Sequence, residues 1–177
     1  MPLRDALQAR RSERSFARRP LDLQTLSDLL WAAFGPISAR RRSAPSSHNR
    51  QETDLYVLLE QGAYIYDPVE NRLVGVTEED LRAASGSQDY VGTAPLELAF
   101  VADKGKITGK TDRGVVETIY VDTGFISQNV YLFCASEGLA TVVRAMVPKD
   151  SLSAKLNLSP TQEITLVQTV GWKPEEK

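Results

Sequence analysis

The chain of 177 residues is poor in the residues that build disulfides and metal sites, with one cysteine and one histidine. A single cysteine cannot form an intrachain disulfide, and the paired Cys and His spacings of structural zinc sites are missing. We therefore expect no metal site. We place Cys134 in the apolar core, because free cysteine packs well there.

Long apolar runs are also missing. No stretch approaches the ~18 consecutive apolar residues of a membrane-spanning helix, and residues 1–5 have no signal-peptide core. We expect a cytoplasmic protein without a membrane partner, and a chain from which a leader had been removed would begin in the same way. With 42% hydrophobic and 25% charged residues, the composition predicts one packed domain over residues 1–177.

The formal net charge of −2 conceals an asymmetry. Residues 1–50 hold ten arginines against four acidic residues, a net +6, whereas residues 51–177 hold eleven basic against nineteen acidic residues, a net −8. A basic arm makes a nucleic-acid binder an alternative. We expect no nucleic-acid partner, because the arm lacks interleaved stacking aromatics: besides Phe16 and Phe34 it holds only Trp31, inside an apolar helix pattern.

Apolar spacing predicts the elements of one α+β domain, in which three short strands joined by tight turns form an antiparallel meander. Residues 36–54 have no apolar period and are predicted as a long loop, opening a short helix near Ser47; such loops are often functional. The helix at 115–137 is either one helix or two broken around 123–124. The predicted helices are 3–11, 23–34 (capped by Asp22 and ended by Gly35), 77–84, 115–137 and 148–156, and the predicted strands and short apolar stretches are 55–59, 63–66, 72–76, 96–102, 141–143 and 164–170.

The first chemical motif is Arg10-Arg11-Ser12-x-Arg14-x-Phe16, at the end of the first predicted helix. Guanidinium groups bind phosphate through paired, charge-assisted hydrogen bonds, and a serine hydroxyl adds a donor. The motif alone is also compatible with a solvated, helix-ending charge run.

The second motif is Pro45-Ser46-Ser47-His48-Asn49-Arg50-Gln51, which gathers hydroxyls and side-chain amides. Amides offer both a donor and an acceptor, as the edge of a planar heterocycle requires. By itself the motif is also compatible with an ordinary turn.

Together, in this order and at this separation, the two motifs resemble the signatures of the nitroreductase family of flavin enzymes. Residues 122–124, 128–129 and 135–139 are similar to that family's central helix and its Gly-Leu end, and residues 142–144 match the flavin-facing segment that follows. The stretch 62–76 resembles the branch that contains SagB-type peptide dehydrogenases. The likeness covers essentially the whole chain.

The resemblance implies an FMN site and its residues. Arg10 and Ser12 match positions that hold the FMN phosphate and ribityl chain, with Arg11 beside them. Arg14 matches the position at the pyrimidine edge of the flavin, where a cation stabilises the negative charge of the reduced ring. The partner subunit's loop would contribute Pro45, Ser46, Ser47 and Asn49, and the segment near the hydride-accepting nitrogen would be Val142, Val143 and Arg144.

The resemblance further implies a nitroreductase-like α+β fold with a mainly antiparallel central sheet flanked by helices. It also implies an intertwined homodimer with two interfacial FMN sites. Its chemistry is ping-pong hydride transfer from NAD(P)H to the flavin and then to an electron-poor acceptor, such as a nitro compound or quinone. The alternative is a family member that binds flavin without nicotinamide turnover, for storage, sensing or peptide dehydrogenation. A nucleic-acid binder stays the second alternative.

Several residues keep open roles. His48 is a weak catalytic candidate against a locally hydrogen-bonded loop residue, and Arg40 to Arg42 are a solvated run or an attractor for an anionic substrate. Many family members have Pro-Trp after the second motif, where this chain has Glu52-Thr53. Lys173 is a candidate for the phosphate contact that the family places after the last strand.

Overall fold

A computed structural model describes residues 1–175. Its sheet has six strands in the order β5-β4-β3-β6-β8-β7, and every neighbouring pair is antiparallel. The predicted α+β class with an antiparallel sheet is confirmed. The strands are β3 (Thr53–Leu59), β4 (Gly62–Asp67), β5 (Arg72–Thr77), β6 (Leu96–Asp103), β7 (Leu139–Arg144) and β8 (Gln162–Trp172).

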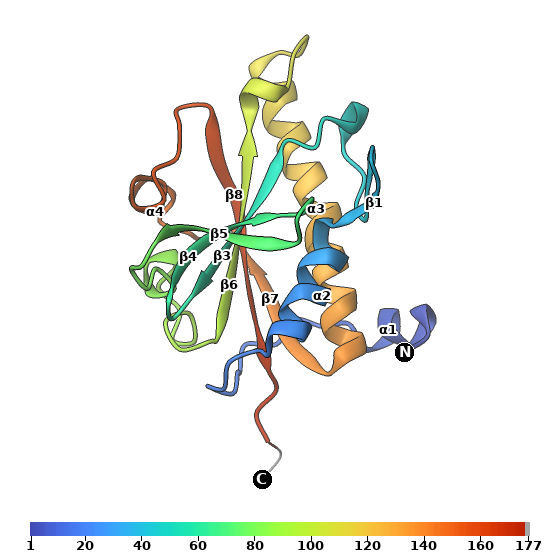
Figure 1. Cartoon of the computed structure of the whole chain (residues 1–177), viewed down its shortest axis with the longest axis vertical. Coiled ribbons are helices and arrows are strands. Elements are labelled where there is room, and N and C mark those ends of the chain that lie inside the picture. Colours follow the sequence, from blue (N-terminus) through green and yellow to red (C-terminus); the bar gives the residue numbers. More distant parts are fainter. Residues whose placement is uncertain (176–177) are drawn as a thin grey trace.

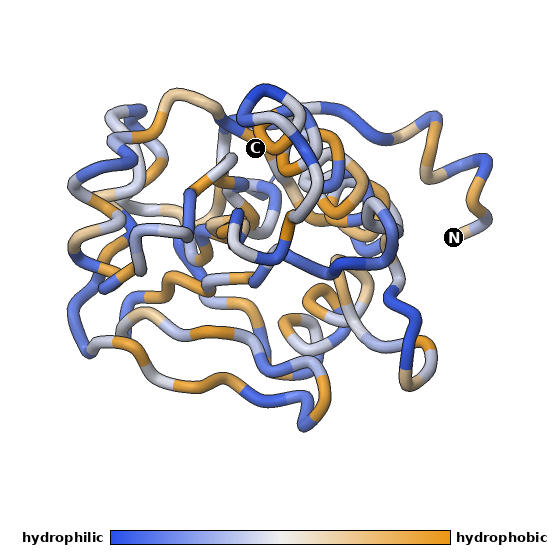
Figure 2. The backbone as a smooth tube through the Cα atoms, turned by 90° about the horizontal axis from the view of Figure 1, so that it is seen from above, coloured by the Kyte–Doolittle hydropathy of each residue, from blue (hydrophilic) through white to orange (hydrophobic). Residues whose placement is uncertain are grey.

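Helices cover both faces of this sheet (Figure 1). On one side, α2 packs on the 26-residue α3, and α3 in turn contacts β3, β7 and β8; on the other side α4 packs on β8. The helix α1 lies at the edge of the molecule beside α3, as Figures 1 and 2 show. The helices are α1 (Leu3–Ala9), α2 (Leu23–Phe34), α3 (Asp112–Glu137) and α4 (Lys149–Lys155), with short 3₁₀ turns η1 (Ser47–Asn49), η2 (Ala83–Ser85) and η3 (Lys104–Lys106).

Strand β6 divides the core into two layers because its side chains alternate between the sheet faces. Leu96, Leu98 and Phe100 enter the cluster under α2 and α3, whereas Ala99 and Val101 enter the cluster under α4. All five are completely buried. The near-continuous apolar run of β6 is therefore what a strand covered on both faces requires.

Helix α3 is continuous, so of the two alternatives for residues 115–137 the single helix is correct. Thr111 caps its start, with the side chain accepting a hydrogen bond from the Gly114 amide. Gly138 ends it in the left-handed conformation, at φ 72°, as expected of a C-cap glycine. Cys134 is buried on the core side, as predicted.

Two segments differ from the predictions. Residues 36–54 are not one loop: they contain the hairpin β1 (Pro36–Ser38) and β2 (Arg41–Arg42), and β3 begins at Thr53. The helix predicted over 77–84 is wrong, since β5 continues to Thr77 and only η2 is helical. Asp80 accepts hydrogen bonds from the Arg82 amide and guanidinium, a local side-chain alternative to helix formation.

No helix within residues 1–175 combines the length and apolar character needed to cross a membrane.

Candidate functional site

The basic segment after α1 is fixed to the edge of the sheet by its backbone. The Glu13 amide donates to the Thr141 carbonyl of β7, and the Ala17 amide donates to the Trp172 carbonyl of β8, each at 2.9 Å. The predicted helix over 3–11 therefore ends at Ala9, and the following residues extend along β7. Residues 10–17 therefore form a fixed strip of polar and charged side chains along the edge of the sheet, which we call the basic strip.

Tyr131 joins the first motif to the segment 142–144. Its phenolic oxygen lies 2.7 Å from Ser12 Oγ and accepts a 3.1 Å hydrogen bond from the Val143 amide, and the Arg10 guanidinium lies 5.2 Å from its ring centroid. Because the amide already donates to the phenolic oxygen, the phenolic O–H is able to donate to Ser12. The serine O–H is then free for a ligand oxygen.

Further cations surround a cleft of about 360 Å³ beside this strip. Arg11, Arg14 and Lys173 line it with Glu13, Ser15 and Pro174. Glu13 pairs with Arg11 at 2.6 Å and with Lys173 at 3.5 Å, so one carboxylate faces two cations. Planar guanidiniums, an ammonium and nearby hydroxyls form a donor set suited to a phosphate, which is the anionic group of FMN.

Arg14 also reaches Tyr90, whose ring packs on Phe16 with centroids 5.4 Å apart. Burial raises the pKa of Tyr90, and the charges of Arg144 and Arg14 oppose that rise. Residues 85–92 thus meet the basic segment, a contact that sequence reasoning missed.

The second motif is attached to α3 at a different place. The Ser47 amide donates to Asp122 Oδ2 at 2.7 Å, and the Gln51 amide donates to Ser46 Oγ at 2.9 Å. His48, Asn49 and Gln51 have positive φ values of 55°, 54° and 50°. Positive φ is uncommon for any residue other than glycine, and it is less common for Gln than for His and Asn, so the anchoring hydrogen bonds hold a strained turn.

His48 has a local partner within this turn. Its Nδ1 lies 2.8 Å from Arg50 Nη1, and because arginine has no acceptor, Nδ1 must accept. Ser47 Oγ lies 3.2 Å from the same nitrogen. These contacts favour the locally hydrogen-bonded interpretation of His48.

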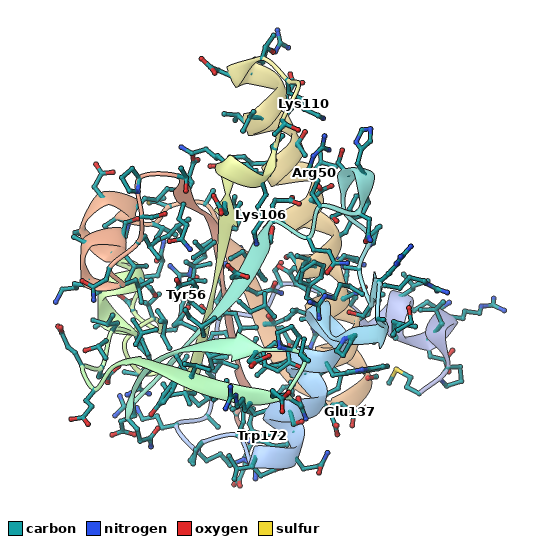
Figure 3. The ribbon with its side chains drawn as sticks, turned by 45° about the horizontal axis from the view of Figure 1, so that its top comes forward. Arg50, Tyr56, Lys106, Lys110, Glu137 and Trp172 are labelled. Carbon is teal, nitrogen blue, oxygen red and sulfur yellow. The ribbon has the colours of Figure 1, made fainter. Side chains whose placement is uncertain are left out.

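The two motifs lie on opposite sides of α3. Asp122 and Tyr131, their respective anchors, are nine residues apart, which corresponds to about 13 Å along the axis and a rotation of about 180°. Figure 3 shows Arg50 and Lys106 toward one end of α3, and Glu137 and Trp172 toward the other. One chain therefore does not bring the two motifs together.

Residues 142–144 are divided by strand alternation. The Val143 amide faces Tyr131, whereas the Arg144 guanidinium is buried with Glu97, with Nη2 2.6 Å from Glu97 Oε2. Burial raises the pKa of Glu97 to about 7, against the opposing charge of Arg144. The guanidinium also donates to the Ser85 carbonyl. The Arg144 guanidinium therefore has a structural role. A ligand could contact only the backbone of Arg144.

Sequence reasoning gave no role to Tyr131, Asp122 or Glu52. The signal for Tyr131 was a tyrosine on the buried side of a long helix, because a buried phenol needs a hydrogen-bond partner. The signal for Glu52 was a glutamate at the start of an apolar strand. Both Glu52 and Asp122 are buried.

A cleft of about 580 Å³ lies elsewhere, between α1, α2 and α3. Large apolar side chains near it are exposed, including Leu3 at 66% and Trp31 at 49%. Helix α1 buries only Ala6. This apolar face has the character of an association surface.

Comparisons with known proteins agree with this geometry. The model of the Nitroreductase family matches residues 7–172. The Methanocaldococcus jannaschii protein named "Putative nitroreductase MJ1384" is 33% identical over 152 residues, which is 79% of this chain and 76% of that protein. A solved structure from Ralstonia eutropha JMP134, also described as a putative nitroreductase, superposes with a TM-score of 0.93 at 38% identity, covering 99% of this chain and 85% of the other.

A further solved structure, a chain of the Escherichia coli microcin synthetase McbBCD complex, has the same fold with a TM-score of 0.81 at 20% identity, covering 93% of this chain and 69% of that chain. The family match supports a flavin oxidoreductase of the nitroreductase type. The chain belongs to the nitroreductase family.

Proposed function

We propose that the protein is an FMN-dependent NAD(P)H oxidoreductase that works as a homodimer in the cytoplasm, with residues 1–177 forming one FMN-binding domain per chain. The observation that carries the proposal is the donor set on the segment after α1, where Tyr131 of α3 contacts Ser12 and Arg10, beside the cleft lined by Arg11 and Arg14. A dianionic phosphate and a polar chain match these donors.

Bound FMN would accept a hydride from NADH or NADPH and pass it to an electron-poor acceptor, such as a nitro compound or a quinone. Arg10, Arg11, Ser12 and Lys173 would hold the phosphate and ribityl chain. Arg14 would face the electron-rich edge of the ring, and the backbone of residues 142–144 would lie along it. The protein surfaces that cover the flavin ring would then determine which nicotinamide and which acceptor bind.

A second chain would complete the site. The Pro45–Asn49 loop is held on the side of α3 opposite to Tyr131, which supports a role for it at the site of a neighbouring molecule. The exposed apolar side chains of α1 and α2 supply a surface for that neighbour. We propose that each subunit contributes Ser46, Ser47 and Asn49 to the FMN site of its partner.

An anaerobic titration tests the proposal. The purified protein should be yellow or should take up added FMN, and its flavin absorption should bleach with NADH or NADPH. Colourless protein that takes up no FMN contradicts the proposal. Yellow protein that no nicotinamide reduces would favour the alternative of a family member without nicotinamide turnover.

Matched variants locate the cofactor. Arg10→Ala and Ser12→Ala should weaken FMN binding about tenfold or more and about fivefold, respectively, because charge-assisted hydrogen bonds contribute more than neutral ones. The control is Arg113→Ala, since Arg113 is an exposed α3 residue paired only with Glu117. Unchanged FMN affinity in both test variants would place the cofactor elsewhere.

A further inference from the structure

Buried polar atoms without partners gather in one segment of the chain. Within residues 1–175, the buried side-chain oxygens that lack a hydrogen-bond partner belong to Ser43, Glu52 and Thr53, and Glu52 accounts for two of the four atoms. Glu52 is completely buried. An orphaned carboxyl in a native interior needs a specific explanation.

The neighbour of this carboxyl is another carboxyl. Asp122 of α3 lies beside Glu52 within hydrogen-bonding reach and is 3% exposed. Lys106 is the closest cation that acts on Glu52, but its Nζ donates to the Gln51 carbonyl at 3.4 Å. The other charged or titratable groups on adjoining elements are His48 and Arg50 in the loop, Asp54 on β3 and Asp103 on β6, whose amide donates to the Glu52 carbonyl.

Two carboxyl groups in buried contact cannot both be ionised without a large cost. Burial, reinforced by Asp122, raises the pKa of Glu52 to about 7. One proton between the two groups satisfies Glu52, because its O–H can then donate to an Asp122 oxygen. Asp122 Oδ2 at the same time accepts the Ser47 amide.

We propose that Glu52 and Asp122 share one proton and that this carboxyl pair positions the Pro45–Asn49 loop for the FMN site of the partner subunit. The inference rests on the proposed function, which assigns the loop to that site. Both residues are positioning residues, because they act on the flavin through the Ser47 amide. When the proton leaves to solvent, two adjacent carboxylates repel each other, and Asp122 loses its fixed place under the strained turn.

This arrangement is specific to the residue after the second motif. Glu52 brings a carboxyl to a buried position directly after that motif. The pair therefore gives the loop a dependence on pH near neutrality.

The test is FMN affinity from pH 6 to pH 9 in the wild type, Glu52→Gln and the exposed control Glu70→Gln. Glutamine mimics the protonated glutamate, since its amide N–H can donate to Asp122. We expect the wild type and Glu70→Gln to lose about tenfold in affinity over this range, and Glu52→Gln to hold its low-pH affinity. A flat wild type, or a Glu52→Gln variant with the wild-type slope, overturns the proposal.

An infrared titration of the wild-type protein gives a readout that does not depend on flavin. A protonated-carboxyl band should decrease between pH 6 and pH 9 in the wild type. Glu52→Gln should lose the part of this change that belongs to Glu52 and keep the part that belongs to Glu97, whose pKa is also raised to about 7. If the wild type shows no such band, the pair is refuted even where the variant does not fold. Protein that binds no FMN at any pH but shows the band refutes the proposed function and leaves proton sharing intact.

Discussion

The side chains of Glu52 and Glu97 are equally buried, but the groups that surround them differ. Both are completely buried, and burial raises the pKa of each to about 7. Glu97 lies 2.6 Å from the Arg144 guanidinium, and both of its oxygens accept from Thr169 Oγ1 at 2.9 Å. Glu52 has Asp122 for a neighbour and, within residues 1–175, no donor.

The difference teaches that burial of a charge does not define its role. A carboxylate with a cation and a hydroxyl donor is a structural group that connects β6 to β7 and β8. A carboxyl that faces another carboxyl is a titratable group, and here it lies under a loop assigned to a binding site. Four substitutions, from the largest expected effect to the smallest, test this contrast.

Arg144→Met should destabilise the protein most, by about 3–5 kcal/mol at pH 8, because it leaves Glu97 buried without its cation. The loss should be smaller at pH 5, where Glu97 can take up a proton. Urea denaturation at the two pH values measures both. Equal losses at the two pH values would show that packing, and not charge, dominates this site.

Glu52→Gln should stabilise the protein at pH 8 by on the order of 2 kcal/mol. The folded pKa of Glu52 lies above its ordinary value of 4.5, so the stability that the protonated group contributes is complete below pH 4.5 and is lost as the pH rises through about 7. Gln cannot ionise, and the gain should therefore vanish at pH 4. Denaturation curves at pH 4 and pH 8, with Glu70→Gln as the exposed control, check the sign.

Asp122→Asn should change stability by about 1 kcal/mol, because the new side chain keeps an acceptor for the Ser47 amide and removes the like charge. The Asp122 carboxylate raises the pKa of Glu52. The midpoint of the pH-dependent loss of stability should therefore move to lower pH. If the midpoint does not move, the titration of Glu52 does not depend on Asp122, and the proposed carboxyl pair is contradicted.

Glu117→Gln should change stability by less than about 0.5 kcal/mol. Its partner Arg113 is 88% exposed, and Glu117 itself is 60% exposed. Thermal or urea denaturation at low and high salt measures the effect. A loss comparable to that of Arg144→Met would mean that burial is not the variable that separates these carboxylates.

The sequence predicted what local rules determine. Asp22 accepts from the Thr25 amide at the start of α2, and Gly35 and Gly138 end α2 and α3 as expected. The strands were visible as apolar runs with short turns between them. The helix over 77–84 failed because Asp80 and Arg82 satisfy each other locally, which a capping pattern does not reveal.

The sequence predicted which segments form the candidate site. It did not predict how the side chains of these segments contact one another. The residues of the first motif were identified from their resemblance, but Tyr131 lies 119 positions from Ser12 and reaches it only through the packing of α3. Glu52 and Asp122 are also far apart in the sequence, and their contact depends on β3 and α3 meeting. Arg144 fell within the right segment, yet strand alternation directs its side chain to Glu97.

The positions of Asp122 and Tyr131 on opposite sides of α3 predict how defective chains would complement each other in a mixed dimer. In the proposed dimer, one helix serves two active sites: Tyr131 belongs to the site of its own chain and Asp122 to that of its partner. A chain defective at Ser12 and a chain defective at Ser47 would then complement each other. Their mixed dimer would carry one site with both defects and one site with none, so half of the activity would return from two inactive parents.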